Sequence, residues 1–388
     1  MMLASKLSTT QNVILFERGE RLGKKLSATG NGQGNLTNLG VLDAEYFSQA
    51  NVAQSQIRDI LYRYDNSAFC KYLQSLGILW IADERGRIYP AGRQASAVTD
   101  ALRFFIAGKG VDVRLGEKVI SIEKRANGFC LQTEQEGKTQ EYSAENVVLC
   151  AGGKAAKNFG TDGTAYALVK GFGHTVTPLF PSLVQLKTET THVKTLKGIR
   201  INDGVLRAQT GDLAPICVRG DIIFTDYGVS GDAVFRISAF IADKIAEKTT
   251  KLSIDFLPDF SESDILNILE NKRKELSAIP AGELLSGIVN NQVGRAVLKR
   301  ADGDLKKAAK LIKDFALPVT GSLGFDYAQV TKGGIPLLEV DENLQSRFAP
   351  GLYFAGEILD VDGQCGGYNL QWAFSSAMTV ADALNAKN

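Results

Sequence analysis

Residues 351–377 read GLYFAGEILDVDGQCGGYNLQWAFSSA, a pattern that predicts a buried strand, a glycine-rich turn and the start of a helix. Gly366 and Gly367 lie where the helix begins, so a bound molecule can approach the exposed N–H groups and the positive end of the helix dipole closely. Such a helix start stabilises negative charge on a ligand. Glu357 comes after Gly356 at the end of the strand and is placed to bind a ribityl or ribose hydroxyl. The segment therefore predicts part of a dinucleotide site in an α/β fold.

Three other residues of this stretch have ordinary structural explanations. Asp360 and Asp362 are at least as well explained as turn residues. Trp372 lies at helical spacing from Tyr368, and we expect it in the core rather than against a ligand.

An acidic residue and a glycine-rich loop near the start of the chain predict a second part of the same site. Asn12–Phe16 is an apolar run typical of a buried parallel strand, and Glu17 ends it where dinucleotide folds place the carboxylate that binds a ribose. A solvated surface carboxylate explains Glu17 alone equally well. The loop that follows favours binding, because in it glycines alternate with amides: Gly30, Asn31, Gly32, Gln33, Gly34 and Asn35. Three glycines in five residues exceed the needs of a turn, so we expect this loop to approach a phosphate or a ring closely.

The composition is that of a globular protein and disfavours several other classes. With 388 residues, 44% of them hydrophobic and 22% charged, the chain is long enough for two or three structural units. Lys plus Arg number 44 against 43 for Asp plus Glu, so net charge gives no reason to expect a nucleic-acid or membrane partner. Five cysteines without a CxxC pair and only two histidines predict no metal centre and favour the reducing cytoplasm. We expect His174 to have a capping or packing role.

The order of expected elements predicts an α/β domain that is interrupted by insertions. Helices are expected over Met2–Leu7, Ile57–Gly77, Ser96–Lys109 and Asn369–Leu384, and strands over Asn12–Phe16, Val111–Arg114, Val119–Lys124, Phe129–Thr133, Gln140–Ser143, Asn146–Cys150 and Gly351–Ala355. Short alternating strands between Pro181 and Asp255 indicate a barrel or a sandwich, and Ser261–Phe315 is expected to be helical with an N-cap at Ser261. The domains expected are a dinucleotide-binding domain of residues 1–185 and 325–388, a β-barrel of 186–258 and 316–324, and a helical subdomain of 259–315.

Motifs along essentially the whole chain resemble those of one family, the BaiN/YhiN-like flavoproteins, also called the aminoacetone-oxidase family. The motifs are ERLGKKLSATGNGQGNLTN, GRIYPAGRQAS, VVLCAGGKA, TDGTAYALVKGFGH, GDIIFTDYGVSGDAVFRIS, VTKGGI and GLYFAGEILDVDGQCGGYNLQWAFSS. Members of this family are NAD(P)/FAD-dependent oxidoreductases. The resemblance implies an FAD-binding, two-dinucleotide-binding (Rossmann-like) domain with an inserted β-barrel and a small helical subdomain.

The resemblance also implies an FAD site built from both ends of the chain. Glu17 would bind the adenosine ribose, Lys25 and the loop from Gly30 to Asn35 would lie along the pyrophosphate and the flavin, and the backbone of Val119 would meet the adenine. Ala151 and Gly152 would form the second dinucleotide contact. Ribityl and isoalloxazine would be held by Gly356, Glu357, Gly366, Gly367, Tyr368 and Asn369. We expect Gly367 to lie so close to the flavin ring that a Cβ would collide with it. The motifs assign no catalytic residue.

The sequence departs from the family pattern at its start. The family begins with a β-strand and a GxGxxG loop whose helix cradles the FAD pyrophosphate, and roughly 15 to 25 residues of that unit are absent before the helix at Met2–Leu7. A mis-called start or truncated chain and a genuine loss of flavin binding are competing explanations. The intact remaining motifs favour the first, so we expect the present chain to bind FAD weakly.

The activity expected from the resemblance is NAD(P)H-driven reduction of an activated C=C bond in a small molecule, with FAD carrying the hydride. No second GxGxxG loop is present for a nicotinamide domain, so NAD(P)H would visit the flavin transiently. One alternative is reduction of a uridine in ribosomal RNA, and another is a non-catalytic remnant. The basic residues that could contact RNA are Arg295, Lys299, Arg300, Lys306, Lys307, Lys310 and Lys313. A solvated helix face explains these charges better, and the sequence predicts no oligomeric state.

Overall fold

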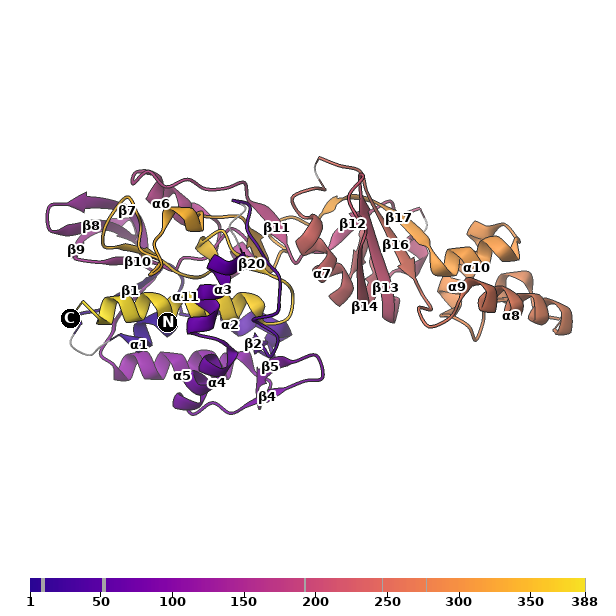
Figure 1. Cartoon of the computed structure of the whole chain (residues 1–388), viewed down its shortest axis with the longest axis horizontal. Helices are drawn as coiled ribbons and strands as arrows, with labels where there is room; N and C mark the ends of the chain where they lie inside the picture. Colours follow the sequence, from indigo (N-terminus) through magenta and orange to yellow (C-terminus); the bar gives the residue numbers. More distant parts are fainter. Residues whose placement is uncertain (8–10, 51–53, 192, 246, 277, 388) are drawn as a thin grey trace. The chain divides into compact units, whose positions relative to one another are not determined.

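The computed structural model describes residues 1–7, 11–50, 54–191, 193–245, 247–276 and 278–387. These residues form two compact units (Figure 1). The first unit is Met1–Phe180 with Gln329–Asn388, and the second is Pro181–Ala328. The ends of the chain thus build one unit around a continuous insertion.

Two pairs of parallel strands lie in the first unit. β1 (Ile14–Glu17) pairs with β6 (Asp112–Leu115), and β10 (Val147–Leu149) pairs with β19 (Leu352–Phe354). Every residue of β19 is buried, as expected for an apolar parallel strand. These strands confirm the parallel α/β character that the sequence predicts.

The C-terminal helix α11 (Tyr368–Asn385) is the central helix of the first unit. Its buried residues occur on most of its faces, which identifies it as a core helix rather than a surface helix. Helices α1 (Met2–Lys6) and α3 (Gln54–Arg63) contact it, and Figure 1 shows indigo α1 beside yellow α11. Helix α5 (Ala95–Gly108) also contacts α1, so the first unit has one continuous hydrophobic core.

Smaller elements of the first unit carry the loops that matter for the site. They are α2 (Lys24–Ala28), β2 (Thr37–Asn38), β3 (Tyr46–Phe47), β4 (Trp80–Ala82), β5 (Arg87–Pro90), α6 (Ala167–Lys170), β18 (Val330–Lys332) and β20 (Asp362–Gly363). The expected meander is confirmed as the antiparallel strands β7 (Lys118–Arg125), β8 (Gly128–Gln135) and β9 (Lys138–Ala144).

The expectation of one helix over Ile57–Gly77 was wrong. The structure has two helices there, α3 and α4 (Asn66–Ser75), with a break at Asp65. The Asp65 carboxylate accepts a hydrogen bond of 2.8 Å from the amide of Ala68. An aspartate that caps the start of a helix in this way ends the preceding helix, because its own backbone is extended.

The second unit contains the closed barrel that the short strands predict. Around the barrel the strands run β12 (Leu186–Thr188), β15 (Gly228–Ser230), β14 (Ile216–Phe224), β13 (Arg200–Thr210), β16 (Thr250–Asp255) and β17 (Phe315–Ser322). Strand β11 (Phe180–Ser182) begins at the boundary of the two units. One segment expected as strand is a helix, α7 (Asp232–Ile241). Its buried residues recur with the helical period, at Ala233, Val234, Ile237 and Ile241.

Three helices follow β16 and share a hydrophobic core with the barrel. They are α8 (Glu262–Glu275), α9 (Asn291–Ala301) and α10 (Leu305–Lys313). The expected N-cap at Ser261 is confirmed, because its hydroxyl accepts from the amide of Asp264 and the Asp264 carboxylate accepts from the amide of Ser261. Helix does not continue to Phe315, where β17 begins. Because of the shared core, the expected helical subdomain is part of one compact unit with the barrel.

Candidate functional site

The turn between β20 and α11 is fixed by side chains from two distant segments. Asn369 accepts a 2.8 Å hydrogen bond from the amide of Gly363 and donates one of 2.8 Å to its carbonyl. Asn38, from β2, donates its side-chain N–H to the carbonyl of Gly366 at 3.0 Å. The start of α11 is therefore held in place by hydrogen bonds from within the turn and from the N-terminal segment.

Gly367 forms the N-cap of α11, and the structure shows a reason for glycine there that the sequence did not predict. Its φ of 100° lies in the left-handed region, and a Cβ there would come within 2.4 Å of the carbonyl oxygen of Thr37. A Cβ here would thus collide with the protein's own backbone, and the expected closeness of Gly367 to a flavin ring stays a prediction. Gly366, with a φ of 131°, would bring its Cβ within 3.2 Å of the Tyr368 ring.

A buried hydrogen-bond network behind this turn was not predicted from the sequence. The hydroxyl of Thr37 donates to the side-chain oxygen of Gln371, which is fully buried. The side-chain N–H of Gln371 donates to the carbonyl of Tyr64 at 2.8 Å. Thr37 and Gln371 are 334 positions apart, so local patterns could not pair them. The feature of the sequence that could have pointed to this network is the segment LTN, residues 36–38, which follows the glycine loop and contains Thr37.

Lys25 and Glu357, both expected at the cofactor, lie together and form an ion pair of 2.7 Å. Both side chains are mostly buried, with 27% and 20% of their surface exposed. The other carboxylate oxygen of Glu357 accepts a 2.9 Å hydrogen bond from the amide of Thr331. The Thr331 hydroxyl in turn accepts from the amides of Lys154 and Ala155 at 2.7 and 2.8 Å.

Ala151 and Gly152 follow β10, and the glycine lies beside the same carboxylate. A Cβ on Gly152 would be 4.0 Å from a carboxylate oxygen of Glu357 and 2.8 Å from the Thr161 side chain. Gly152 has a φ of 73°, whereas Ala151 is exposed. Glu357 therefore connects the end of β19, α2 and the segment after β10.

The glycine loop is mostly left-handed and leaves open space at one position. Gly30, Asn31, Gly32 and Gly34 all have positive φ, between 53° and 82°. A Cβ on Gly30 would press on the amide of Asn35, and one on Gly34 would press on Ala95, but a Cβ on Gly32 would meet no described atom within 4 Å. Among the described residues, the buried side-chain oxygen of Asn35 has no hydrogen-bond partner. The loop therefore combines free space with an unused acceptor.

Glu17 and Val119, the residues expected near the adenosine, are brought close by the strands that carry them. A Glu17 carboxylate oxygen accepts a 2.7 Å hydrogen bond from the amide of Gly19. The backbone carbonyl of Glu17 accepts from the amide of Glu117, one residue before β7, on which Val119 pairs with Thr133. Arg18 forms a 2.8 Å ion pair with Asp162, which holds the pKa of that carboxyl well below its usual range.

A buried polar group lies beside Glu357. The carboxylate of Asp360 accepts from the Ser48 hydroxyl at 2.9 Å and from the amides of Gln49 and Ala50 at 3.0 and 2.8 Å, so it holds a distant segment rather than its own turn. Burial nevertheless raises the pKa of Asp360. The hydroxyl of Tyr166 is buried and has no partner among the described residues. Burial, together with Glu357 and Asp360, raises the pKa of Tyr166.

Two further residues have the packing roles expected of them. Trp372 is buried and donates its ring N–H to the carbonyl of Gly356 at 3.2 Å. His174 is buried between Glu339 at 2.8 Å and Ser346 at 2.7 Å. The Ser346 oxygen also accepts from the amides of Phe348 and Ala349, and it is buried, so this serine–histidine–glutamate group supports the fold rather than offering a nucleophile.

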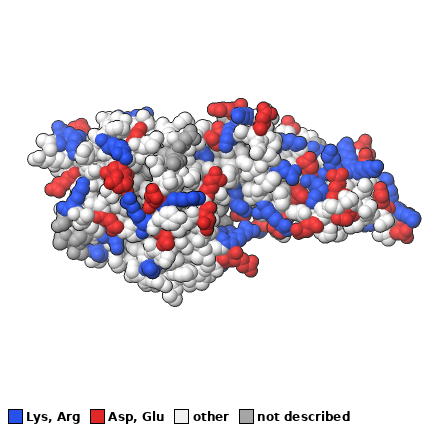
Figure 2. All heavy atoms as spheres, in the orientation of Figure 1, with Lys and Arg blue, Asp and Glu red and all other residues white. Residues whose placement is uncertain are grey.

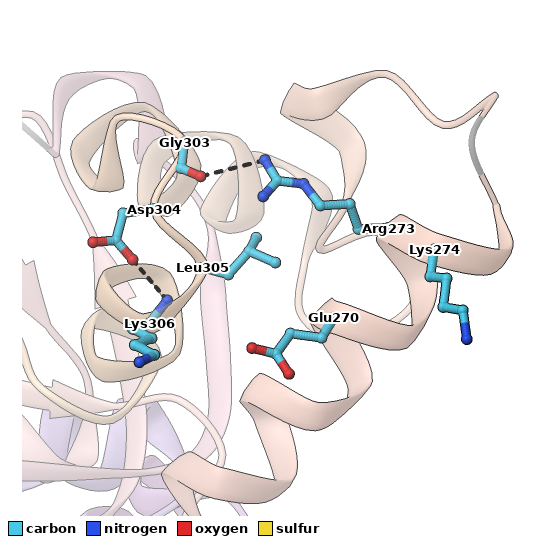
Figure 3. A pocket seen from close by; sticks show the side chains of 7 residues that line it. All are labelled: Glu270, Arg273, Lys274, Gly303, Asp304, Leu305 and Lys306. Atoms are coloured by element: carbon cyan, nitrogen blue, oxygen red, sulfur yellow. Dashed lines mark hydrogen bonds between the residues drawn. The ribbon is translucent and has the colours of Figure 1, made fainter.

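The basic residues considered for RNA binding are partly engaged within the second unit. Arg295 pairs with Glu283 at 2.6 Å and Lys313 with Asp255 at 2.7 Å, while Arg300 lies over the ring of Phe315. Figure 2 shows Lys and Arg interleaved with Asp and Glu over the helices of this unit on the face in view. A pocket between α8 and the start of α10 has the same mixed character (Figure 3); it is lined by Glu270, Arg273, Lys274, Gly303, Asp304, Leu305 and Lys306.

None of the described helices is both long and apolar enough to cross a membrane. Within the described residues, no three His, Cys, Asp or Glu side chains gather in a way that could hold a metal ion.

The sequence of the chain is similar to known proteins along nearly its full length. The model of the HI0933-like protein Rossmann domain matches residues 1–383. The chain is 34% identical to a 3-dehydro-bile acid delta(4,6)-reductase of Clostridium scindens, over 98% of this chain and 94% of that protein. It is 29% identical to a ribosomal RNA dihydrouridine synthase of Escherichia coli, over 97% of this chain and 92% of that protein.

Solved structures share the fold at low sequence identity. A 3-ketosteroid delta1-dehydrogenase from Sterolibacterium denitrificans superposes with a TM-score of 0.52 at 13% identity, covering 100% of this chain and 97% of that one. A 3-ketosteroid-delta4-(5alpha)-dehydrogenase from Rhodococcus jostii gives 0.50 at 15% identity, covering 98% and 94%. These similarities support the architecture of the whole chain.

Proposed function

The chain belongs to the HI0933-like Rossmann-domain family and is an FAD-dependent oxidoreductase, and from this premise we propose that it reduces an activated C=C bond of a small molecule with electrons from NAD(P)H. The similarity to the C. scindens bile acid reductase, over nearly all of both chains, supports reduction as the direction of the reaction. The observation that carries the proposal is the convergence of Lys25, Glu357 and Gly152. These residues come from the segments in which a two-dinucleotide-binding fold holds its flavin.

The residues present fit an FAD. The space beside Gly32 offers room to a bound group. Gly366 and Gly367 leave the start of α11 without a side-chain cap, and the N–H groups of a helix's first turn have no partner within the helix. A helix start of this kind favours negative charge, which a reduced flavin carries on the pyrimidine side of its ring.

Each residue then has a stated task in the proposed reaction. Glu357 would hold the ribityl chain by accepting from its hydroxyls, while Lys25 fixes the carboxylate in place. Glu17 would accept from the adenosine ribose and the backbone of Val119 would face the adenine, with Ala151 alongside. Tyr368 and Asn369 would support the ring at the start of α11. The flavin, when bound, supplies hydride transfer, and the protein supplies its orientation and electrostatics.

NAD(P)H is proposed as a transient donor because the sequence holds no second GxGxxG loop for a nicotinamide. The expected cytoplasmic location rests on the five free cysteines, which suit a reducing compartment.

A second candidate, reduction of a uridine in ribosomal RNA, is supported by the similarity to the E. coli dihydrouridine synthase. Against it stand the intramolecular ion pairs of Arg295 and Lys313, which leave fewer free cations for phosphate contacts. We therefore favour the small-molecule substrate.

The proposal is tested with the purified chain and added FAD. We expect a yellow complex whose flavin absorbance is bleached by NADH or NADPH without oxygen and restored by a conjugated enone. A protein that takes up no FAD under these conditions would overturn the proposal and support the non-catalytic alternative. Re-oxidation by ribosomal RNA fragments but not by enones would support the RNA candidate instead.

A further inference from the structure

Lys332, the last residue of β18, is a buried lysine whose ammonium group lies against an aromatic ring. Only 3% of its surface is exposed. Its ammonium nitrogen lies 4.2 Å from the centre of the Phe47 ring. Across the described ranges, no hydrogen bond or ion pair connects this nitrogen to another residue.

This arrangement leaves a buried charge incompletely compensated. An ammonium has three donors, and removing it from water is costly unless it is paired or hydrogen-bonded. The Phe47 ring compensates only part of that cost, because a cation–π contact satisfies none of the three donors directionally. The Asp360 carboxyl is within electrostatic range, but Ser48, Gln49 and Ala50 already donate to it.

Lys332 lies next to residues that contact two parts of the candidate site, Glu357 and the strand β20 before the glycine turn. Its neighbour Thr331 donates its amide to Glu357, the residue proposed to hold the ribityl chain. Phe47 pairs with Asp362 on β20, the strand that leads directly into the glycine turn. The ammonium nitrogen is not among the unpartnered polar atoms that are completely sealed from solvent.

We propose that the Lys332 ammonium binds the carbonyl oxygen of an α,β-unsaturated carbonyl substrate. This inference rests on the proposed function and names its substrate class. Reducing such a compound adds a hydride from the reduced cofactor to the β-carbon and a proton from water to the α-carbon. Between these two additions, the electron pair displaced from the C=C bond resides largely on the carbonyl oxygen. A fixed cation at that oxygen stabilises the developing negative charge more strongly than the neutral ground state.

The test uses the FAD-loaded protein and 4-chlorophenol, whose phenolate oxygen mimics the enolate oxygen. A phenolate stacked on an oxidised flavin gives a long-wavelength absorbance band, so binding is measured without turnover. We compare Lys332→Met, which keeps the length and apolar body of the side chain, with Lys306→Met on α10 as a matched control. We expect Lys332→Met to weaken phenolate binding about 100-fold, the lower end of the effect of losing one stabilising donor, and Lys306→Met to leave it unchanged.

Sulfite affinity distinguishes the substrate from the cofactor as the partner of Lys332. Sulfite adds to the oxidised flavin, and its affinity falls when a positive charge near the pyrimidine side of the ring is removed. Unchanged sulfite affinity in Lys332→Met together with weakened phenolate binding supports the proposal. An equal loss of sulfite affinity would show that the ammonium faces the flavin, and no change in either affinity would show a structural role; both outcomes overturn it.

Two controls keep the result interpretable. If Lys332→Met does not fold or load FAD, Lys332→Gln replaces it and is expected to show the same loss of phenolate binding. Failure of the proposed function has a different signature, because the unmodified protein would then bind no FAD or would not be reduced by NAD(P)H. Failure of the Lys332 inference alone leaves both of those properties intact.

Discussion

Two glycine-rich segments of the first unit contain glycine for different physical reasons. At Gly367 the chain has no room, because a Cβ would be 2.4 Å from the carbonyl oxygen of Thr37. At Gly32 the chain has room to spare, because a Cβ would meet no described atom within 4 Å, although φ is 82°. The first glycine therefore serves packing of the protein on itself, and the second leaves a surface open to a ligand. In the sequence, both are simply glycines in a polar loop.

The largest effect is expected from Gly367→Ala. The left-handed backbone costs an alanine about 1 to 2 kcal/mol, and the collision with the Thr37 backbone adds about 1 to 3 kcal/mol. We expect urea unfolding to show a loss of about 2 to 5 kcal/mol in the free energy of unfolding, before any cofactor is added. A loss of FAD affinity with unchanged stability would instead mean that the cofactor, and not Thr37, requires this glycine.

A smaller loss is expected from Thr37→Val, which keeps the shape of the side chain but removes its hydroxyl. Gln371 is fully buried, so its side-chain oxygen would be left without that hydrogen bond. Such an unsatisfied group costs about 1 to 3 kcal/mol. Thr37→Ser, which retains the hydroxyl, should recover most of the stability in the same urea titration. If serine and valine were equally destabilising, the network would not be what holds the turn.

Structural features that depend on local sequence patterns could be predicted from the sequence. Features that depend on contacts between distant residues could not. The barrel, the C-terminal helix and the cap at Ser261 followed from periodicity and capping chemistry. The break at Asp65 and helix α7 were missed because tertiary packing selects between short alternatives that look alike. The burial of Lys332 could not be predicted, because a lysine at the end of a strand is most often solvated.

For the candidate site, the sequence predicted that Lys25 and Glu357 contribute but not that they pair with each other. Their ion pair joins segments 332 positions apart, and no spacing rule covers such a distance. The cofactor contacts of the other site residues stay predictions.

Gly32→Ala tests the second glycine of this comparison. It shares the left-handed backbone of Gly367 but lacks the collision, so the expected loss of unfolding free energy is only about 1 to 2 kcal/mol. FAD affinity, measured by flavin fluorescence, should fall more than tenfold, because the methyl group would fill space proposed for the cofactor. If Gly32→Ala were as destabilising as Gly367→Ala without FAD, the two glycines would share one structural role.

The smallest effect on stability and on FAD binding is expected from changes in the second unit, at Lys306 and Lys307. Lys306 and Lys307 lie in the first turn of α10, where the carboxylate of Asp304 accepts hydrogen bonds from their backbone amides. Replacing both with alanine removes two charges without removing that cap, so the free energy of unfolding should change by less than about 0.5 kcal/mol. FAD affinity and reduction by NAD(P)H should be unchanged, because every residue proposed for the cofactor belongs to the first unit. Activity on an enone should likewise be retained, whereas an RNA substrate would bind more weakly and with a shallower salt dependence. A double variant that lost flavin or NAD(P)H reduction while remaining folded would contradict the assignment of the site to the first unit.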